Sequence, residues 1–177
     1  EPLAYLLGQK EFHGLMLNVD ARVLVPRPDT EVLVDWAVEL LGHTLADIAE
    51  PEVIDLGTGS GAIALAVRHA RAAARLTATD ASIGALEVAA ANAARLGLPI
   101  DFAIGHWWQA VAGRRFALAL SNPPYIAGAD AHLPALHAEP RGALTPGESG
   151  LEALDEIIAG APSHLLPGGW LLLEHGF

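Results

Sequence analysis

From residue 51 onward, short apolar runs alternate with longer stretches of helical periodicity, and no other feature constrains the fold as strongly. Strands are expected over 53–56, 76–79, 100–104, 116–121 and 169–174, with helices over 62–74, 82–96 and 150–166. Strands that alternate with helices form a parallel sheet with helices on both faces, so we predict an α/β fold. Ligands of such sheets bind at the carboxyl ends of the strands.

The first 50 residues follow a different pattern. Apolar and polar residues alternate over 12–25, and the break at Asp20–Ala21 predicts a short β-hairpin. An amphipathic helix follows, with Trp36 expected in the core. We therefore assign residues 1–50 to a linker, a hairpin and a first helix, and residues 51–177 to the core.

Composition excludes several classes of function. The chain has no cysteine, which rules out disulfides, thiolate nucleophiles and cysteine-bound zinc and fits a cytoplasmic protein. No apolar run reaches the roughly 18 residues of a membrane span, so we expect no membrane contact. The formal net charge of −11 is the wrong sign for binding phosphates, so we expect a protein partner and no direct nucleic acid. We also expect a monomer.

A glycine-rich turn supplies the first chemical signal. It runs from Asp55 to Gly61, between a strand and a helix, and such turns let a ligand lie against bare backbone. Asp80 ends the next strand, where a carboxylate accepts hydrogen bonds from the hydroxyls of an adenosine ribose. The spacing fits both NAD and S-adenosylmethionine. Asp55 favours the latter, because a carboxylate repels a pyrophosphate and attracts an ammonium group.

The second signal is Asn122-Pro123-Pro124-Tyr125, which we call the diproline corner, at the end of the strand predicted over 116–121. Two prolines fix the backbone and donate no hydrogen bond. The Asn122 side-chain oxygen and the Pro123 carbonyl together suit both hydrogens of a planar NH₂ group, on which Tyr125 can stack. Such a nitrogen is a poor nucleophile, and positioning it beside an already activated methyl sulfonium lowers the barrier. We therefore predict an N-methyltransferase in which Asn122, Pro123 and Tyr125 are catalytic.

Two further features bear on the site. Arg27, in the rigid Pro26–Pro28 turn, is expected to brace the substrate pocket through a bidentate pair, with a surface salt bridge as the alternative. His132 and His137 lack acidic partners at ligand spacing, so no metal site is expected.

Together these motifs resemble the HemK/PrmC family of release factor glutamine methyltransferases over nearly the whole chain. The matching segments are Tyr5–Gly8, Glu11–Phe12, Val25–Glu31, Asp55–Gly61, Asp80, Ser121–Ile126, Glu139–Pro140 and Leu173–Gly176. The resemblance implies a Rossmann-like class I S-adenosylmethionine-dependent methyltransferase sheet preceded by a short β-hairpin. The chain starts without Met and stops after its last predicted strand, so we expect a fragment with truncated C-terminal strands.

The resemblance also implies roles for individual residues. The methyl donor, released as S-adenosylhomocysteine, would contact Gly57, Thr58, Gly59, Ser60, Gly61, Asp80, Trp107 and Asn122. The substrate amide would contact Asn122, Pro123, Pro124 and Tyr125. The substrate would be the glutamine of the Gly-Gly-Gln motif of peptide chain release factors. One departure is His106, where the family usually has an acidic residue that accepts from the adenine amino group.

Several functions besides this one stay open from the sequence. The acceptor could be a ribosomal-protein glutamine or an exocyclic amino group of a nucleic-acid base, since both present a flat NH₂. The chain could also be a non-catalytic domain that binds the methyl donor, or an NAD oxidoreductase.

Overall fold

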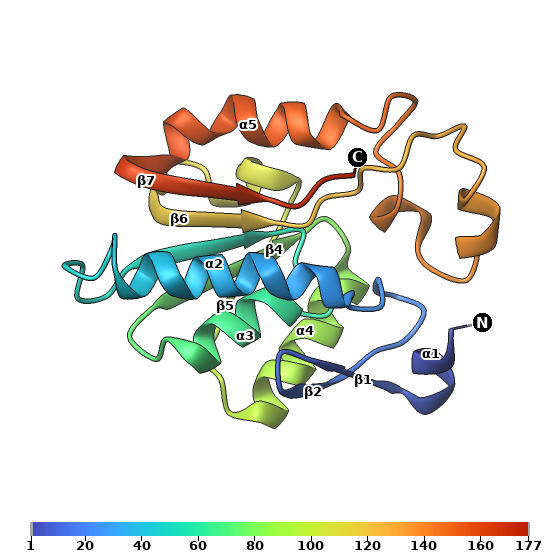
Figure 1. Ribbon diagram of the computed structural model, residues 1–177, viewed down its shortest axis with the longest axis horizontal. Coiled ribbons are helices and arrows are strands. Elements are labelled where there is room, and N and C mark those ends of the chain that lie inside the picture. The colour runs from blue at the N-terminus through green and yellow to red at the C-terminus, as the bar shows by residue number, and fades with distance from the viewer. Residues whose placement is uncertain (1, 177) are drawn as a thin grey trace.

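A five-stranded parallel sheet forms the centre of the structure, a computed structural model that describes residues 2–176 (Figure 1). The strands lie in the order β5-β4-β3-β6-β7, and neighbouring strands pair in parallel. Their bounds are β3 Glu52–Leu56, β4 Arg75–Asp80, β5 Asp101–Ile104, β6 Phe116–Ser121 and β7 Leu165–Leu173. The chain reverses its direction of travel across the sheet between β5 and β6, so β3 and β6 flank the point where such folds bind ligands.

Helices cover both faces of this sheet, as predicted (Figure 1). The elements are α2 (Glu31–Gly42), α3 (Ala62–Ala70) and α4 (Ile83–Leu96) on one face, and α5 (Glu152–His164) with the 3₁₀ turn η2 (Trp107–Val111) on the other. Alternation along β3 explains the two layers. Val53 packs in the core that contains α2 and α3, whereas Ile54 packs with Trp108 and Ile157. Both faces are buried, which is why the central strands read as continuous apolar runs.

A short helix α1 (Leu3–Leu7) and an antiparallel hairpin precede α2. The hairpin pairs β1 (Gln9–Phe12) with β2 (Leu15–Asn18), so its turn lies at His13–Gly14 and the prediction of a break at Asp20–Ala21 was wrong. His13 and Gly14 both have positive φ, 47° and 77°, which is the geometry of a tight two-residue hairpin turn.

Trp36 was also misplaced by sequence reasoning. Its side chain is 60% exposed, and α2 instead buries Leu33, Val34, Ala37 and Leu41. The stripe formed by these smaller residues faces the sheet, and Trp36 points away from it.

The long segment between β6 and α5 contains two 3₁₀ turns, η3 (Leu133–Leu136) and η4 (Arg141–Ala143). Within residues 2–176, no helix combines the length and apolar character needed to cross a membrane.

Candidate functional site

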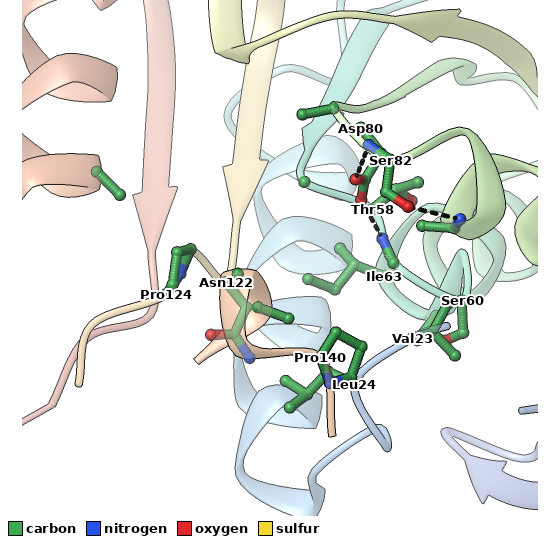
Figure 2. Close-up of a pocket in the computed structure, with 18 of the residues that line it drawn as sticks. Val23, Leu24, Thr58, Ser60, Ile63, Asp80, Ser82, Asn122, Pro124 and Pro140 are labelled. Atoms are coloured by element: carbon green, nitrogen blue, oxygen red, sulfur yellow. Dashed lines mark hydrogen bonds between the residues drawn. The ribbon is translucent and has the colours of Figure 1, made fainter. Parts of the chain in front are cut away.

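The carboxyl ends of β3, β4 and β6 meet at a cavity of about 620 Å³, which we call the nucleoside cavity. Its volume is in the range of roughly 300–1,000 Å³ typical of small-molecule sites. Figure 2 shows Asn122 and Pro124 across the cavity from Asp80 and Ser82. The residues predicted for the donor that line it are Gly57, Thr58, Gly59, Ser60, Asp80, Trp107 and Asn122. The fold therefore brings together residues from four separate segments of the chain.

The turn after β3 is held by backbone hydrogen bonds, which leave its outer surface free for a ligand. The N–H groups of Gly57 and Thr58 both donate to the Thr79 carbonyl, at 2.9 Å each. Gly59 has a φ of +56°, and a Cβ added there would meet nothing within 4 Å. The backbone at Gly59 thus borders open space in the cavity, which fits the close approach of a nucleoside-bearing ligand.

Gly61 departs from the predicted donor site, because it does not line the nucleoside cavity. A Cβ at Gly61 would come within 3.0 Å of Leu65 and 3.2 Å of Ala89. This glycine therefore lies behind the turn, where its lack of a side chain lets α3 and α4 approach.

Asp80 is fixed by two backbone donors. One carboxylate oxygen accepts from the Gly59 N–H and the other from the Ser82 N–H, both at 2.9 Å. Each oxygen keeps capacity for a further hydrogen bond, since a carboxylate has about four acceptor positions. Asp80 is thus oriented in the cavity wall with acceptors suited to two vicinal hydroxyls.

Asp55 holds the turn from inside the protein and does not line the cavity. The expectation that its carboxylate attracts an ammonium group of the ligand therefore finds no support in its position. The side chain is fully buried, and its Oδ2 accepts from the Thr58 hydroxyl at 2.6 Å and the Ala64 N–H at 3.3 Å. Its Oδ1 has no partner among residues 2–176. Burial raises the pKa of Asp55 to about 7, because desolvation outweighs these two hydrogen bonds.

The diproline corner presents two oxygen acceptors. The Asn122 amide nitrogen donates to the Thr30 hydroxyl at 3.0 Å, which orients the amide. Neither the Asn122 side-chain oxygen nor the Pro123 carbonyl accepts a hydrogen bond from residues 2–176. The backbone just before the corner is anchored, because the Ser121 hydroxyl donates to the Leu56 carbonyl at 2.6 Å. The corner is therefore stiff and its two acceptors are free.

A second cavity, of about 340 Å³, lies against the diproline corner, and we call it the acceptor cavity. It is lined by Pro123 and Tyr125, which do not line the nucleoside cavity. Both cavities share Leu24, Arg27, Asn122, Pro124 and Ala143. A group bound in one cavity thus meets a group bound in the other at Asn122 and Pro124.

Tyr125 is fixed by Glu174, the residue that follows β7. Its hydroxyl donates to a Glu174 carboxylate oxygen at 3.3 Å. Burial and the neighbouring Glu174 charge raise the pKa of Tyr125, so the phenol stays protonated. The ring forms one wall of the acceptor cavity.

Arg27 joins the segment before α2 to the long loop after β6. Its guanidinium contacts a Glu139 carboxylate oxygen at 2.5 Å, and the other Glu139 oxygen accepts from the Val25 N–H at 3.1 Å. The Glu139 side chain is 3% exposed. Arg27 thus pairs with a carboxylate through one nitrogen of its guanidinium, so the expectation of a bidentate pair was wrong. Arg27 lines both cavities.

Sequence reasoning missed three residues of the site. Thr30 orients Asn122, Ser82 caps α4 and holds Asp80, and Glu156 contacts His106 at the rim of the nucleoside cavity. Ser82 and Thr30 each had a local signal, as residues at the N-cap of a helix, whereas Glu156 had none. No group of metal-ligating side chains gathers in the part of the chain that the structure describes.

Comparison with known proteins gives three findings. The family described as "Methyltransferase small domain" matches residues 30–174. A "Release factor glutamine methyltransferase" of Xylella fastidiosa is 50% identical over 99% of this chain and 64% of the relative. A protein of the same name from Bordetella pertussis is 51% identical over 100% of this chain and 65% of the relative. The chain therefore spans just under two thirds of these relatives, whose name agrees with the motif resemblance.

Solved structures resemble this fold at low sequence identity. The N-terminal domain of human METTL16 in complex with SAH matches with a TM-score of 0.66 and 20% identity, covering 93% of this chain and 62% of that one. A SAM-dependent methyltransferase from Agrobacterium tumefaciens also gives 0.66, at 18% identity over 94% of this chain and 52% of that one. These likenesses confirm the predicted Rossmann-like class I fold.

Proposed function

Because this chain belongs to the methyltransferase small domain family, we propose that it transfers a methyl group from S-adenosylmethionine to the nitrogen of a planar amide. The observation that carries the proposal is the free pair of acceptors on the diproline corner, at the junction of the two cavities. We further propose that residues 51–177 form the catalytic core and that residues 1–50 complete it, since Arg27 and Thr30 come from the earlier segment.

The nucleoside cavity fits the methyl donor. The part of the donor that lies closest to the protein backbone would contact the open face at Gly59. The oriented Asp80 carboxylate would accept hydrogen bonds from the ribose hydroxyls. The Trp107 ring, which lies over Gly57, would flank the adenine, and Thr58, Ser60 and Asn122 would line the rest. Gly61 would act indirectly: because it has no side chain, α3 can pack closely against α4 and so hold the glycine-rich turn in place. When bound, the donor supplies a methyl group already activated by a sulfonium.

The diproline corner would hold the acceptor. The Asn122 side-chain oxygen and the Pro123 carbonyl would each accept one N–H of the amide, while Pro124 and Tyr125 confine its plane in the acceptor cavity. These contacts fix the nitrogen toward the nucleoside cavity and polarise it as positive charge develops. Holding two reactants in line contributes up to about 7–11 kcal/mol in ideal cases. As the new C–N bond forms, the methyl–sulfur bond of the donor would break and the amide nitrogen would lose one proton to water. The Asn122 and Pro123 oxygens, which are neutral amide acceptors, would hydrogen-bond to that N–H until it leaves.

We propose that the acceptor is the glutamine of the Gly-Gly-Gln motif of peptide chain release factors, giving N5-methylglutamine. Support comes from the relatives' name and from the net charge of −11, which suits a basic protein surface better than a nucleic acid. Such a substrate would place the reaction in the cytoplasm. We propose that the protein acts as a monomer, because both cavities are built from one chain.

Methyl transfer to a purified release factor tests this function. The protein, with any flanking sequence that its gene encodes, is incubated with isotopically labelled S-adenosylmethionine, and the label is located by peptide mass spectrometry. We expect label on the Gly-Gly-Gln glutamine and none on a release factor carrying glutamate there. An Asn122→Ala variant should bind donor but transfer poorly. Donor binding by the unaltered protein without any labelled glutamine would reject the proposed substrate.

A further inference from the structure

A completely buried amide on α4 joins the hairpin to the glycine-rich turn. The Asn92 Oδ1 accepts from the Asn18 N–H at 2.8 Å, and its Nδ2 donates to the Asn18 and Ser60 carbonyls, both at 3.0 Å. All three partners are backbone groups, and Asn18 and Ser60 lie 74 and 32 residues from Asn92. Burial of an amide costs free energy unless such bonds are made. Asn92 lines neither cavity, so it takes no part in the chemistry proposed above.

On one side, Asn92 holds the wall of the nucleoside cavity. Ser60 is buried and lines that cavity. The same helix touches the turn at a second point, because a Cβ added at Gly61 would lie 3.2 Å from the Ala89 Cβ. α4 therefore supports the turn by close packing, and the bond from Asn92 fixes the direction of the Ser60 carbonyl.

On the other side, Asn92 docks the hairpin, which lies beside α4 (Figure 1). Val19 and Val23, which follow β2, pack with Ala85 and Val88 of α4 in one buried cluster. Apolar packing is non-directional, whereas hydrogen bonds require a defined geometry. One amide pairs with both the N–H and the carbonyl of Asn18. These two bonds thus set where the end of β2 sits along the helix.

The hairpin in turn contacts the acceptor side of the site. The His13 N–H, at the hairpin turn, donates to a Glu31 carboxylate oxygen at 3.1 Å. Glu31 follows Thr30, whose hydroxyl accepts from the Asn122 amide nitrogen. The hairpin therefore lies between the donor turn and the residue that orients Asn122.

We propose that Asn92 couples occupancy of the nucleoside cavity to closure of the hairpin on α4, and so acts as a positioning residue. This inference rests on the proposed function and goes beyond it by linking donor binding to the hairpin. A donor that lies against the turn restricts Ser60, whose carbonyl then fixes the plane of the Asn92 amide. An amide held in that plane bonds Asn18 with less loss of conformational freedom, so donor binding and hairpin closure favour each other. The coupling is reciprocal, so a closed hairpin raises donor affinity by the same factor.

Amide hydrogen exchange, measured by NMR with and without S-adenosylhomocysteine, tests the coupling. The reporter is the Val19 N–H, which donates to the Gly8 carbonyl within the hairpin at 3.1 Å. The reference is the Ala74 N–H, which donates to the Arg71 carbonyl at 3.0 Å in a turn that lines neither cavity. In the unaltered chain, saturating ligand should slow exchange at Val19 roughly fivefold more than at Ala74, the value of about one hydrogen bond.

Two variants on α4 separate coupling from general stability. Asn92→Leu keeps a similar size and removes all three bonds, so it should lose the extra slowing at Val19 and weaken S-adenosylhomocysteine binding roughly fivefold by calorimetry. Leu96→Ala, one turn later, removes apolar packing against the core and no hydrogen bond, so it should keep both properties. Thermal unfolding checks that each variant is folded.

Equal slowing at Val19 and Ala74 in the unaltered chain would overturn the coupling, whether or not Asn92→Leu folds, and would leave the proposed function standing. A loss in Leu96→Ala as large as in Asn92→Leu would assign the effect to general stability and overturn it as well. Failure of the unaltered, folded chain to bind S-adenosylhomocysteine at all would refute the donor site and this inference together.

Discussion

The buried carboxyl of Asp55 makes the stability of the protein depend on pH in a direction opposite to that of most aspartates. Burial raises its pKa from 3.8 to about 7, so the folded protein holds this proton more tightly than the unfolded chain does. Its contribution to stability is complete below the unfolded pKa and is lost as the pH rises through about 7. The pKa rises by about three units, and each unit is worth about 1.36 kcal/mol, so the unfolding free energy that is lost at high pH amounts to about 4 kcal/mol.

Comparison with Asp55→Asn isolates this effect. Asparagine keeps an oxygen to accept from the Thr58 hydroxyl and the Ala64 N–H, and it has no proton to lose. Its NH₂ would occupy the place of the unpartnered Oδ1, at a cost that does not vary with pH. The difference in unfolding free energy, unaltered chain minus variant, should therefore fall by about 4 kcal/mol between about pH 4 and about pH 8.

Urea unfolding followed by circular dichroism, at a series of pH values, measures this difference. Other titrating groups are common to both chains and cancel. Asp130→Asn is an informative control, because hydrogen bonds from His132 lower the pKa of Asp130 and the corresponding difference should change in the opposite direction. A difference for Asp55 that stays flat or rises with pH would refute the argument that desolvation controls this carboxyl.

Two further predictions concern the residues that shape the site. Thr30→Val leaves the Asn122 amide nitrogen without its acceptor, so kcat for methyl transfer should fall roughly tenfold with little change in donor affinity. Thr30→Ser keeps the hydroxyl and should restore kcat. Equal losses of kcat in both variants would contradict an orienting role for Thr30. Glu139→Gln sets an amide donor against Arg27 or the Val25 N–H, so the free energy of unfolding, measured by chemical denaturation, should fall by about 1–3 kcal/mol. Glu148→Gln, at the surface, should change it little. Equal unfolding free energies for the two variants would disprove the bracing role of Glu139.

Local sequence patterns were sufficient to predict the fold class and most elements. The strand over 116–121 was predicted with its observed bounds, and the helix after Ser82 begins where its cap indicates. These features depend on side-chain periodicity and on capping, which act over a few residues. Where local signals competed, prediction failed, as at the hairpin turn, which lies at His13–Gly14, and at Trp36, which is exposed.

The candidate site shows the same division. The glycines, Asp80 and the diproline corner each lie within a few consecutive residues. From them the sequence by itself predicted an adenosine-bearing ligand and an acceptor with a planar NH₂ group. Only the tertiary structure decided how those residues are held, because their partners are remote: Thr30 lies 92 residues from Asn122, and Arg27 lies 112 residues from Glu139. Such contacts arise where the ends of parallel strands converge at one edge of the sheet. A hydrogen bond needs its two atoms within about 3 Å, and only the folded chain brings segments so far apart in sequence to that distance.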